Sequence, residues 1–74
     1  MLVTIKYFGQ IAEATQKDEE IYAFSGGLVS DLLNSLYEKY SALKNNDFKV
    51  AQNQELVSNE SKITGEEIAL LPPF

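Results

Sequence analysis

The 74-residue sequence carries eleven acidic residues against six lysines, which gives a net charge of −5 at pH 7, and it contains neither cysteine nor histidine. These counts exclude disulfides, thiolate metal sites and catalysis by a serine–histidine or cysteine–histidine pair. The acidic balance and the lack of arginine argue against nucleic-acid binding. No apolar run approaches the roughly 20 residues of a membrane span, so we expect one domain over residues 1–74, no membrane contact and a cytoplasmic location.

The first half of the sequence predicts two strands followed by one helix. Residues 2–8 (LVTIKYF) and 19–24 (EEIYAF) alternate as a strand with one buried face does. A polar connection with one helical turn joins them. Leucines and tyrosines then recur at steps of three and four residues, which predicts an amphipathic helix from Val29 to Tyr40.

The second half predicts three short strands. Residues 48–57 (FKVAQNQELV) indicate a hairpin with a tight turn at 53–55, and residues 68–71 form a last strand. Leu43 and Ile63 are apolar residues within polar connections, and we expect both to reach the core. The order β-β-α-β-β-β indicates the α+β class, with one main helix packed on a mixed sheet of four to five strands.

The polar clusters and glycines offer little chemistry. The acidic residues at 18–20 and 66–67 begin strands, where neighbours point to opposite faces, so we interpret them as solvated rather than as an acid–base pair. Gly26 and Gly27 precede the helix, but the phosphate-loop pattern is absent. Gly9 is interpreted as a turn residue. We therefore expect no catalytic, cofactor-binding or metal-binding residue within the sequence.

An apolar patch is predicted on the outer surface of the sheet. By alternation, Phe8 lies opposite Val3 and shares its face with Lys6, and Leu71 lies on the outer face of the last strand. If the first and last strands are neighbours, Phe8 and Leu71 come close together, and Leu56 joins them from the hairpin. Such a patch on a small domain usually marks a partner surface. The alternative is that single apolar residues are exposed without a function.

The last residues, LLPPF, are shaped by their two prolines. Leu71 and Pro72 each precede a proline, which favours extended backbone, and neither Pro72 nor Pro73 can donate a hydrogen bond to a sheet. Consecutive prolines favour a stiff polyproline arm. We predict an extended tail from about residue 72 that projects away from the sheet; the alternative is a frayed terminus.

Three stretches resemble the small subunit of molybdopterin synthase, the ubiquitin-like sulfur carrier of molybdenum-cofactor synthesis. They are VTIKYFGQIAE, VAQNQELV and ITGEEIALLPPF, which together reach from residue 3 to residue 74. The last is the most specific, because the related sulfur carriers of thiamin synthesis and tRNA thiolation lack the double proline. The resemblance implies a ubiquitin-like β-grasp fold in which the last strand pairs beside the first.

The resemblance also implies a function and two partners. In that family an ATP-dependent, ubiquitin-activating-like enzyme adenylates the C-terminal carboxylate of a Gly-Gly tail, which is then converted to a thiocarboxylate. The tail enters the large subunit of molybdopterin synthase, within a heterotetramer, and donates sulfur to a pterin precursor. The chain would therefore be a subunit of a sulfur-transferase complex that is not catalytic alone, and the activating enzyme rather than this chain would use the ATP.

The residues that the resemblance assigns to partner binding are Phe8, Leu56, Leu71, Pro72, Pro73 and Phe74. The sequence stops at Phe74, before any Gly-Gly pair, and we expect the chain in this form not to carry the thiocarboxylate in the family's manner. Three more residues would add about 10 Å of extended reach. The missing glycines favour one alternative, a ubiquitin-like interaction domain that uses the same patch without sulfur transfer. Another is a sulfur carrier of a different pathway, such as thiamin synthesis or tRNA thiolation, and the sequence does not separate molybdenum from tungsten.

Overall fold

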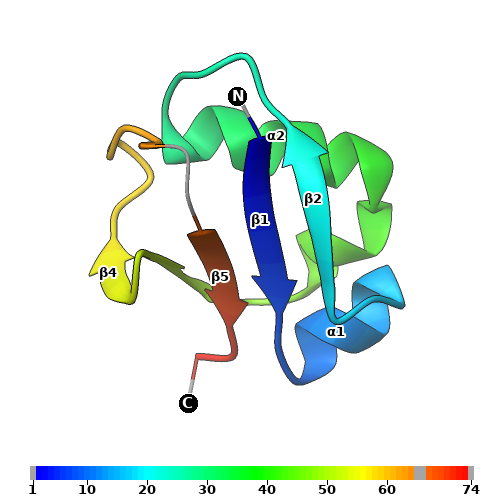
Figure 1. Ribbon diagram of the computed structural model, residues 1–74. Coiled ribbons are helices and arrows are strands. Elements are labelled where there is room, and N and C mark those ends of the chain that lie inside the picture. The colour runs from blue at the N-terminus through cyan, green and yellow to red at the C-terminus, as the bar shows by residue number, and fades with distance from the viewer. Residues whose placement is uncertain (1, 65–66, 74) are drawn as a thin grey trace.

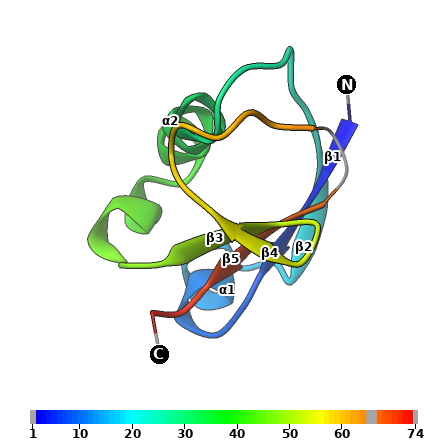
Figure 2. The same ribbon diagram turned by 90° about the vertical axis from the view of Figure 1, so that its left-hand side faces the viewer.

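The structure, a computed structural model, describes residues 2–64 and 67–73. Its elements are β1 (Leu2–Tyr7), α1 (Gln10–Thr15), β2 (Glu19–Ala23), α2 (Val29–Lys39), the 3-10 helix η1 (Ser41–Asn45), β3 (Lys49–Gln52), β4 (Glu55–Val57) and β5 (Glu67–Leu71). The strands form one sheet in the order β2-β1-β5-β3-β4, and α2 packs across one face of it (Figures 1 and 2). The predicted α+β class, with one main helix on a mixed sheet, is confirmed.

The centre of the sheet is the parallel pair of β1 and β5, which lie side by side in Figure 1. Ile5 pairs with Ile68 and Tyr7 pairs with Leu70, and all four are buried. The expectation that the first and last strands are neighbours is therefore correct. Antiparallel pairing adds β2 beside β1, and β3 with β4 beside β5.

The core lies between the inner face of the sheet and the apolar stripe of α2. The stripe consists of Val29, Leu32, Leu33 and Leu36, whose spacing places them on one side of the helix. The remaining core residues are Val3, Ile5, Tyr7, Ile11, Phe24, Leu43, Val50, Ile63, Ile68 and Leu70. Both connection residues that the sequence assigned to the core are among them. None of the helices in the described parts of the chain is long and apolar enough to cross a membrane.

The hairpin turn is shorter than predicted. Asn53 and Gln54 have positive φ angles of 52° and 71°, and Glu55 already belongs to β4. Two consecutive residues of positive φ form the turn type whose twist matches that of the flanking strands. The turn expected just before the last strand falls largely on residues 65–66, which lie outside the described residues.

The structure contains more helix than predicted in two connecting segments, α1 and η1, and α2 ends one residue before its predicted end. α1 covers Gln10–Thr15 instead of a single turn, since Ile11 and Thr15, one turn apart, are both buried. η1 replaces the predicted loop and places Leu43 in the core. Tyr40 caps α2 through its backbone N–H, which donates to the carbonyl of Leu36 at 2.7 Å. The side-chain hydroxyl of Tyr40 donates a hydrogen bond to a carboxylate in β2.

That carboxylate is Glu20, which ties the edge strand β2 to the helical layer. Its Oε1 accepts hydrogen bonds from the hydroxyls of Tyr7 and Tyr40, both at 2.6 Å, and its Oε2 accepts one from Nζ of Lys39 at 2.8 Å. Burial raises the pKa of Glu20, but the hydrogen bonds from Lys39 and the two tyrosines outweigh burial and lower the pKa from 4.5 to about 2. The network therefore favours the ionised carboxylate.

We expect Glu20→Gln to lower the free energy of unfolding by about 1–3 kcal/mol at neutral pH, because it removes the charge that three donors share. The folded-state pKa lies below the unfolded one, so the ionised group stabilises the fold above pH 4.5, and this contribution is lost as the pH falls toward about 2. Urea denaturation of both proteins across this range should show the difference shrinking in acid. The control Glu38→Gln, at an exposed position of α2, should change the free energy of unfolding by less than about 0.5 kcal/mol at neutral pH. A difference for Glu20→Gln that does not change with pH would contradict the assignment.

Candidate partner-binding face and tail base

One face of the sheet is not covered by α2, as Figure 2 shows. Among the described residues, the exposed large apolar side chains are Leu2 (66% exposed), Phe8 (43%), Ile21 (69%) and Leu56 (64%). Strand alternation and register place all of them on this open face, opposite the residues that pack on α2. The apolar surface that the fold leaves in water is therefore concentrated on one side of the molecule.

Phe8, Leu56 and Leu71 line one hollow on the open face, of about 540 Å³, which we call the outer-face hollow. Its other lining residues are Lys6, Ala51, Gln54, Glu67 and Ala69. Ala51 pairs with Leu56 on one side and with Ala69 on the other, so small side chains separate the larger ones. The structure thus brings together the three patch residues that the sequence predicted.

One ion pair borders the outer-face hollow. Nζ of Lys6 lies 2.9 Å from a carboxylate oxygen of Glu67, and both side chains are partly exposed. The hydrogen bond and the charge of Glu67 raise the pKa of Lys6. An exposed pair of this kind contributes little to folding and is free to exchange partners. The hollow therefore offers an apolar surface with one positive and one negative group at its border, which suits a protein partner.

The tail leaves the sheet close to this hollow. β5 ends at Leu71, and the half-buried Pro72 and Pro73 follow it beyond the end of the strand (Figures 1 and 2). Neither proline belongs to the core between the sheet and α2. Pro72 and Pro73 belong to no helix or strand, and the extended course of the tail stays a prediction. Phe74, which the sequence also assigned to partner binding, lies outside the described residues.

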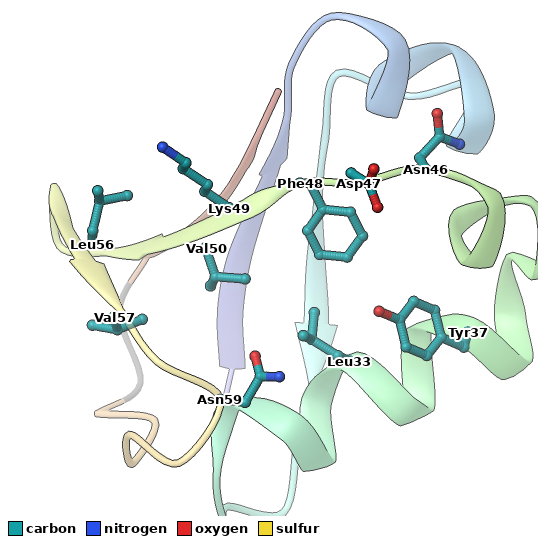
Figure 3. Close-up of a pocket in the computed structure, with 10 residues that line it drawn as sticks. All are labelled: Leu33, Tyr37, Asn46, Asp47, Phe48, Lys49, Val50, Leu56, Val57 and Asn59. Carbon is teal, nitrogen blue, oxygen red and sulfur yellow. The ribbon is translucent and has the colours of Figure 1, made fainter. Parts of the chain in front are cut away.

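A second hollow, of about 440 Å³, lies between α2 and the β3–β4 hairpin (Figure 3). Leu33, Phe48 and Val50 point into it, while Lys49 and Leu56 point to the other side of the hairpin. Asp47 is the one carboxylate among its described lining residues. Across the described part of the chain, no three histidine, cysteine, aspartate or glutamate residues are grouped so as to hold a metal ion. This second hollow offers neither an acid–base pair nor a ligand set.

Sequence reasoning missed two features of the open face. Leu2 and Ile21 are its most exposed apolar side chains, and the alternation that singled out Phe8 also places them on this face. Gly9, interpreted only as a turn residue, adopts a φ of 56°, and a methyl group built on it would lie 2.9 Å from Cγ of Pro72. No local pattern indicates that contact, because it joins opposite ends of the chain.

The sequence profile of the ThiS family matches residues 5–74. A Pyrococcus furiosus protein assigned as subunit 1 of molybdopterin converting factor superposes with a TM-score of 0.91 at 22% identity, covering 100% of this chain and 99% of that one. The small archaeal modifier protein 1 of Haloferax volcanii gives 0.86 at 21% identity, covering 99% and 98%. A chain from the Helicobacter pylori complex of molybdopterin-converting factor subunits 1 and 2 gives 0.71 at 22% identity, covering 100% and 96%. These similarities confirm the β-grasp fold.

We expect Phe8→Ala to change the free energy of unfolding by less than about 1 kcal/mol, because the side chain is already partly in water. Leu70→Ala, on the same end of the sheet but fully buried, should cost about 2–5 kcal/mol. Urea denaturation of the isolated domain compares the two. A loss for Phe8→Ala as large as that for Leu70→Ala would show that Phe8 belongs to the core rather than to the open face.

Proposed function

Because the chain belongs to the ThiS family, we propose that it is a sulfur carrier that acts as the small subunit of a molybdopterin synthase. The observation that carries the proposal is the pairing of an uncovered apolar hollow with a proline-stiffened tail that leaves the sheet beside it. The outer-face hollow supplies a surface to which a partner can bind, and the tail supplies an arm that can insert into that partner. The same two features would serve the large synthase subunit and an adenylating enzyme.

In this proposal the folded domain supplies the partner-binding surface and holds the tail. Phe8, Leu56 and Leu71 would make the apolar contacts with the large subunit, since exposed apolar residues that gather in one hollow are what a partner interface buries. Pro72 and Pro73 restrict the tail before binding, which lowers the ordering cost of inserting it into the partner. The complex would be a heterotetramer, assembled through the large subunits, in the cytoplasm.

The chemistry would take place on the backbone, beyond residue 74. An activating enzyme would use ATP to adenylate the carboxylate of a terminal Gly-Gly pair, releasing pyrophosphate and making the carboxyl carbon a better electrophile. A sulfide-level sulfur donor would then displace AMP to leave a thiocarboxylate. The thiocarboxylate sulfur would then be donated to a pterin precursor. Such a scheme needs no cysteine or histidine from this chain, and the sequence has neither.

A second candidate function is a ubiquitin-like modifier or interaction domain without sulfur transfer to a pterin. It is favoured by the similarity to the Haloferax volcanii modifier protein, whose fold matches this chain over nearly its whole length. The outer-face hollow would serve either function, because binding through it does not depend on what the tail carries. Sulfur carriage for thiamin synthesis or tRNA thiolation is the remaining alternative within the ThiS family.

Intact-mass spectrometry of the protein isolated from its own cells separates the candidates. A sulfur carrier should include a species in which one oxygen of the C-terminal carboxylate is replaced by sulfur, and this species should disappear when the adenylating enzyme is deleted. A mature C-terminus that lacks glycine, with no sulfur-bearing species, would exclude sulfur carriage. Recovery of the chain joined to other proteins would favour the modifier function.

We expect Phe8→Ala and Leu71→Asp each to weaken binding to the large synthase subunit by at least about 2 kcal/mol, if both are central contacts. Ile21→Ala is the matched control, because Ile21 is exposed on the same face but does not line the outer-face hollow. Isothermal titration calorimetry with the purified large subunit measures all three. Equal losses for Ile21→Ala and Phe8→Ala would move the interface to another part of the sheet.

A further inference from the structure

The turn after β1 has a backbone conformation that only glycine adopts without strain. Gly9 has φ 56° and ψ −131°, a combination that the Cβ of an L-residue disfavours. Its carbonyl accepts hydrogen bonds from the N–H groups of Ala12 at 3.1 Å and Glu13 at 3.4 Å, so α1 begins from this residue. The turn is therefore fixed at its far end by a helix.

The same turn holds the end of β5 at two points. The N–H of Phe8 donates to the carbonyl of Leu70 at 3.3 Å. The ring of Pro72 occupies the place where a side chain at position 9 would stand, because a Cβ on Gly9 would come within 2.9 Å of its Cγ. The two contacts bracket Leu71, the last residue of the sheet before the tail.

We infer that Gly9 is a positioning residue for the tail, and that its missing side chain forms a seat for the Pro72 ring that sets the direction in which the tail leaves the domain. The side chain of Phe8 lines the outer-face hollow while the next residue seats the tail, so one turn fixes both features relative to each other. For a partner bound at the outer-face hollow, the base of the tail would then lie at a fixed position relative to the bound surface. This use of the seat rests on the proposed function, whereas the seat itself belongs to the fold.

The seat matters because it sets the orientation of a stiff arm whose reactive group lies at the far end. A polyproline arm extends by about 3.1 Å per residue, so a small rotation at Pro72 becomes a displacement of several ångström at the end of the arm. Misplacing a reacting group by about 1 Å can slow a reaction by about a hundredfold. A residue far from the reactive end can therefore control how often that end reaches its target.

A set of three proteins made by chemical synthesis tests the seat: the unchanged chain, Gly9→Ala, and the chain with D-alanine at position 9. L-alanine places a methyl group against Pro72 and strains the positive φ. D-alanine favours positive φ and carries its methyl group at the other Hα position of Gly9 instead of the position that meets the ring, so it is the matched control. Nuclear Overhauser contacts between residues 9 and 72, and residual dipolar couplings of residues 70–73, report the direction of the tail base.

The unchanged chain and the D-alanine protein should share the contact and the couplings, whereas Gly9→Ala should lose the contact and change the couplings of residues 72–73. Contacts between β1 and β5 should persist, which distinguishes a redirected tail from an unfolded sheet. If Gly9→Ala does not fold, Pro72→Ala removes the ring instead and should broaden the tail directions while the sheet is unchanged. Absence of the contact in the unchanged chain, or unchanged couplings in Pro72→Ala, would overturn the inference.

Sulfur transfer provides the second readout, with each protein carrying a C-terminal Gly-Gly thiocarboxylate. Gly9→Ala should lower the transfer rate by about tenfold to a hundredfold while its affinity for the large subunit stays close to that of the D-alanine protein. Equal rates for the L- and D-alanine proteins would overturn the positioning role. If no protein in the set transfers sulfur, the proposed function fails, and the magnetic-resonance measurements still decide whether the seat exists.

Discussion

The parallel pairing of β1 with β5 is the constraint on which the rest of the molecule depends. It places Ile5 beside Ile68 and Tyr7 beside Leu70 at the centre of the sheet, under α2. Because parallel strands end at the same edge, the turn after β1 and the tail after β5 leave the sheet side by side. The outer-face hollow, the Gly9 turn and the two prolines are neighbours for this one reason.

The open face follows from the size of the chain. A domain of 74 residues with one main helix covers one side of its sheet, and the apolar residues on the other side remain in water. The chain places them on β1, β2 and β4 and in the turn after β1, instead of replacing them with charged residues. A partner that covered this face would supply the layer that the domain lacks, which is the usual meaning of a concentrated apolar surface.

Sequence alone predicted the strands, the helix and the open-face position of Phe8, since each depends on periodicity within a few residues. It did not predict that Tyr40 leaves α2 to bond Glu20, because that hydrogen bond joins a helix end to an edge strand. Nor did it give the length of α1, which depends on where Ile11 and Thr15 are buried. The order of the strands came from a family resemblance, and the Gly9–Pro72 contact from the structure, because alternation carries no information on which strands are neighbours.

The central position of β5 also governs how the protein acquires its structure during synthesis. Of the five strands, β5 is the last to be made, yet β1 and β3 both depend on it for their second neighbour. Until it emerges from the ribosome, the β1–β2 and β3–β4 ladders have no strand to join them, and their inner faces stay incompletely covered. Closing a sheet through partners so distant along the chain is entropically costly and slows folding. The nascent chain therefore completes its sheet only after β5 has been made, which leaves the β1–β2 and β3–β4 pairs, not yet joined by β5, as the species that chaperones would meet first.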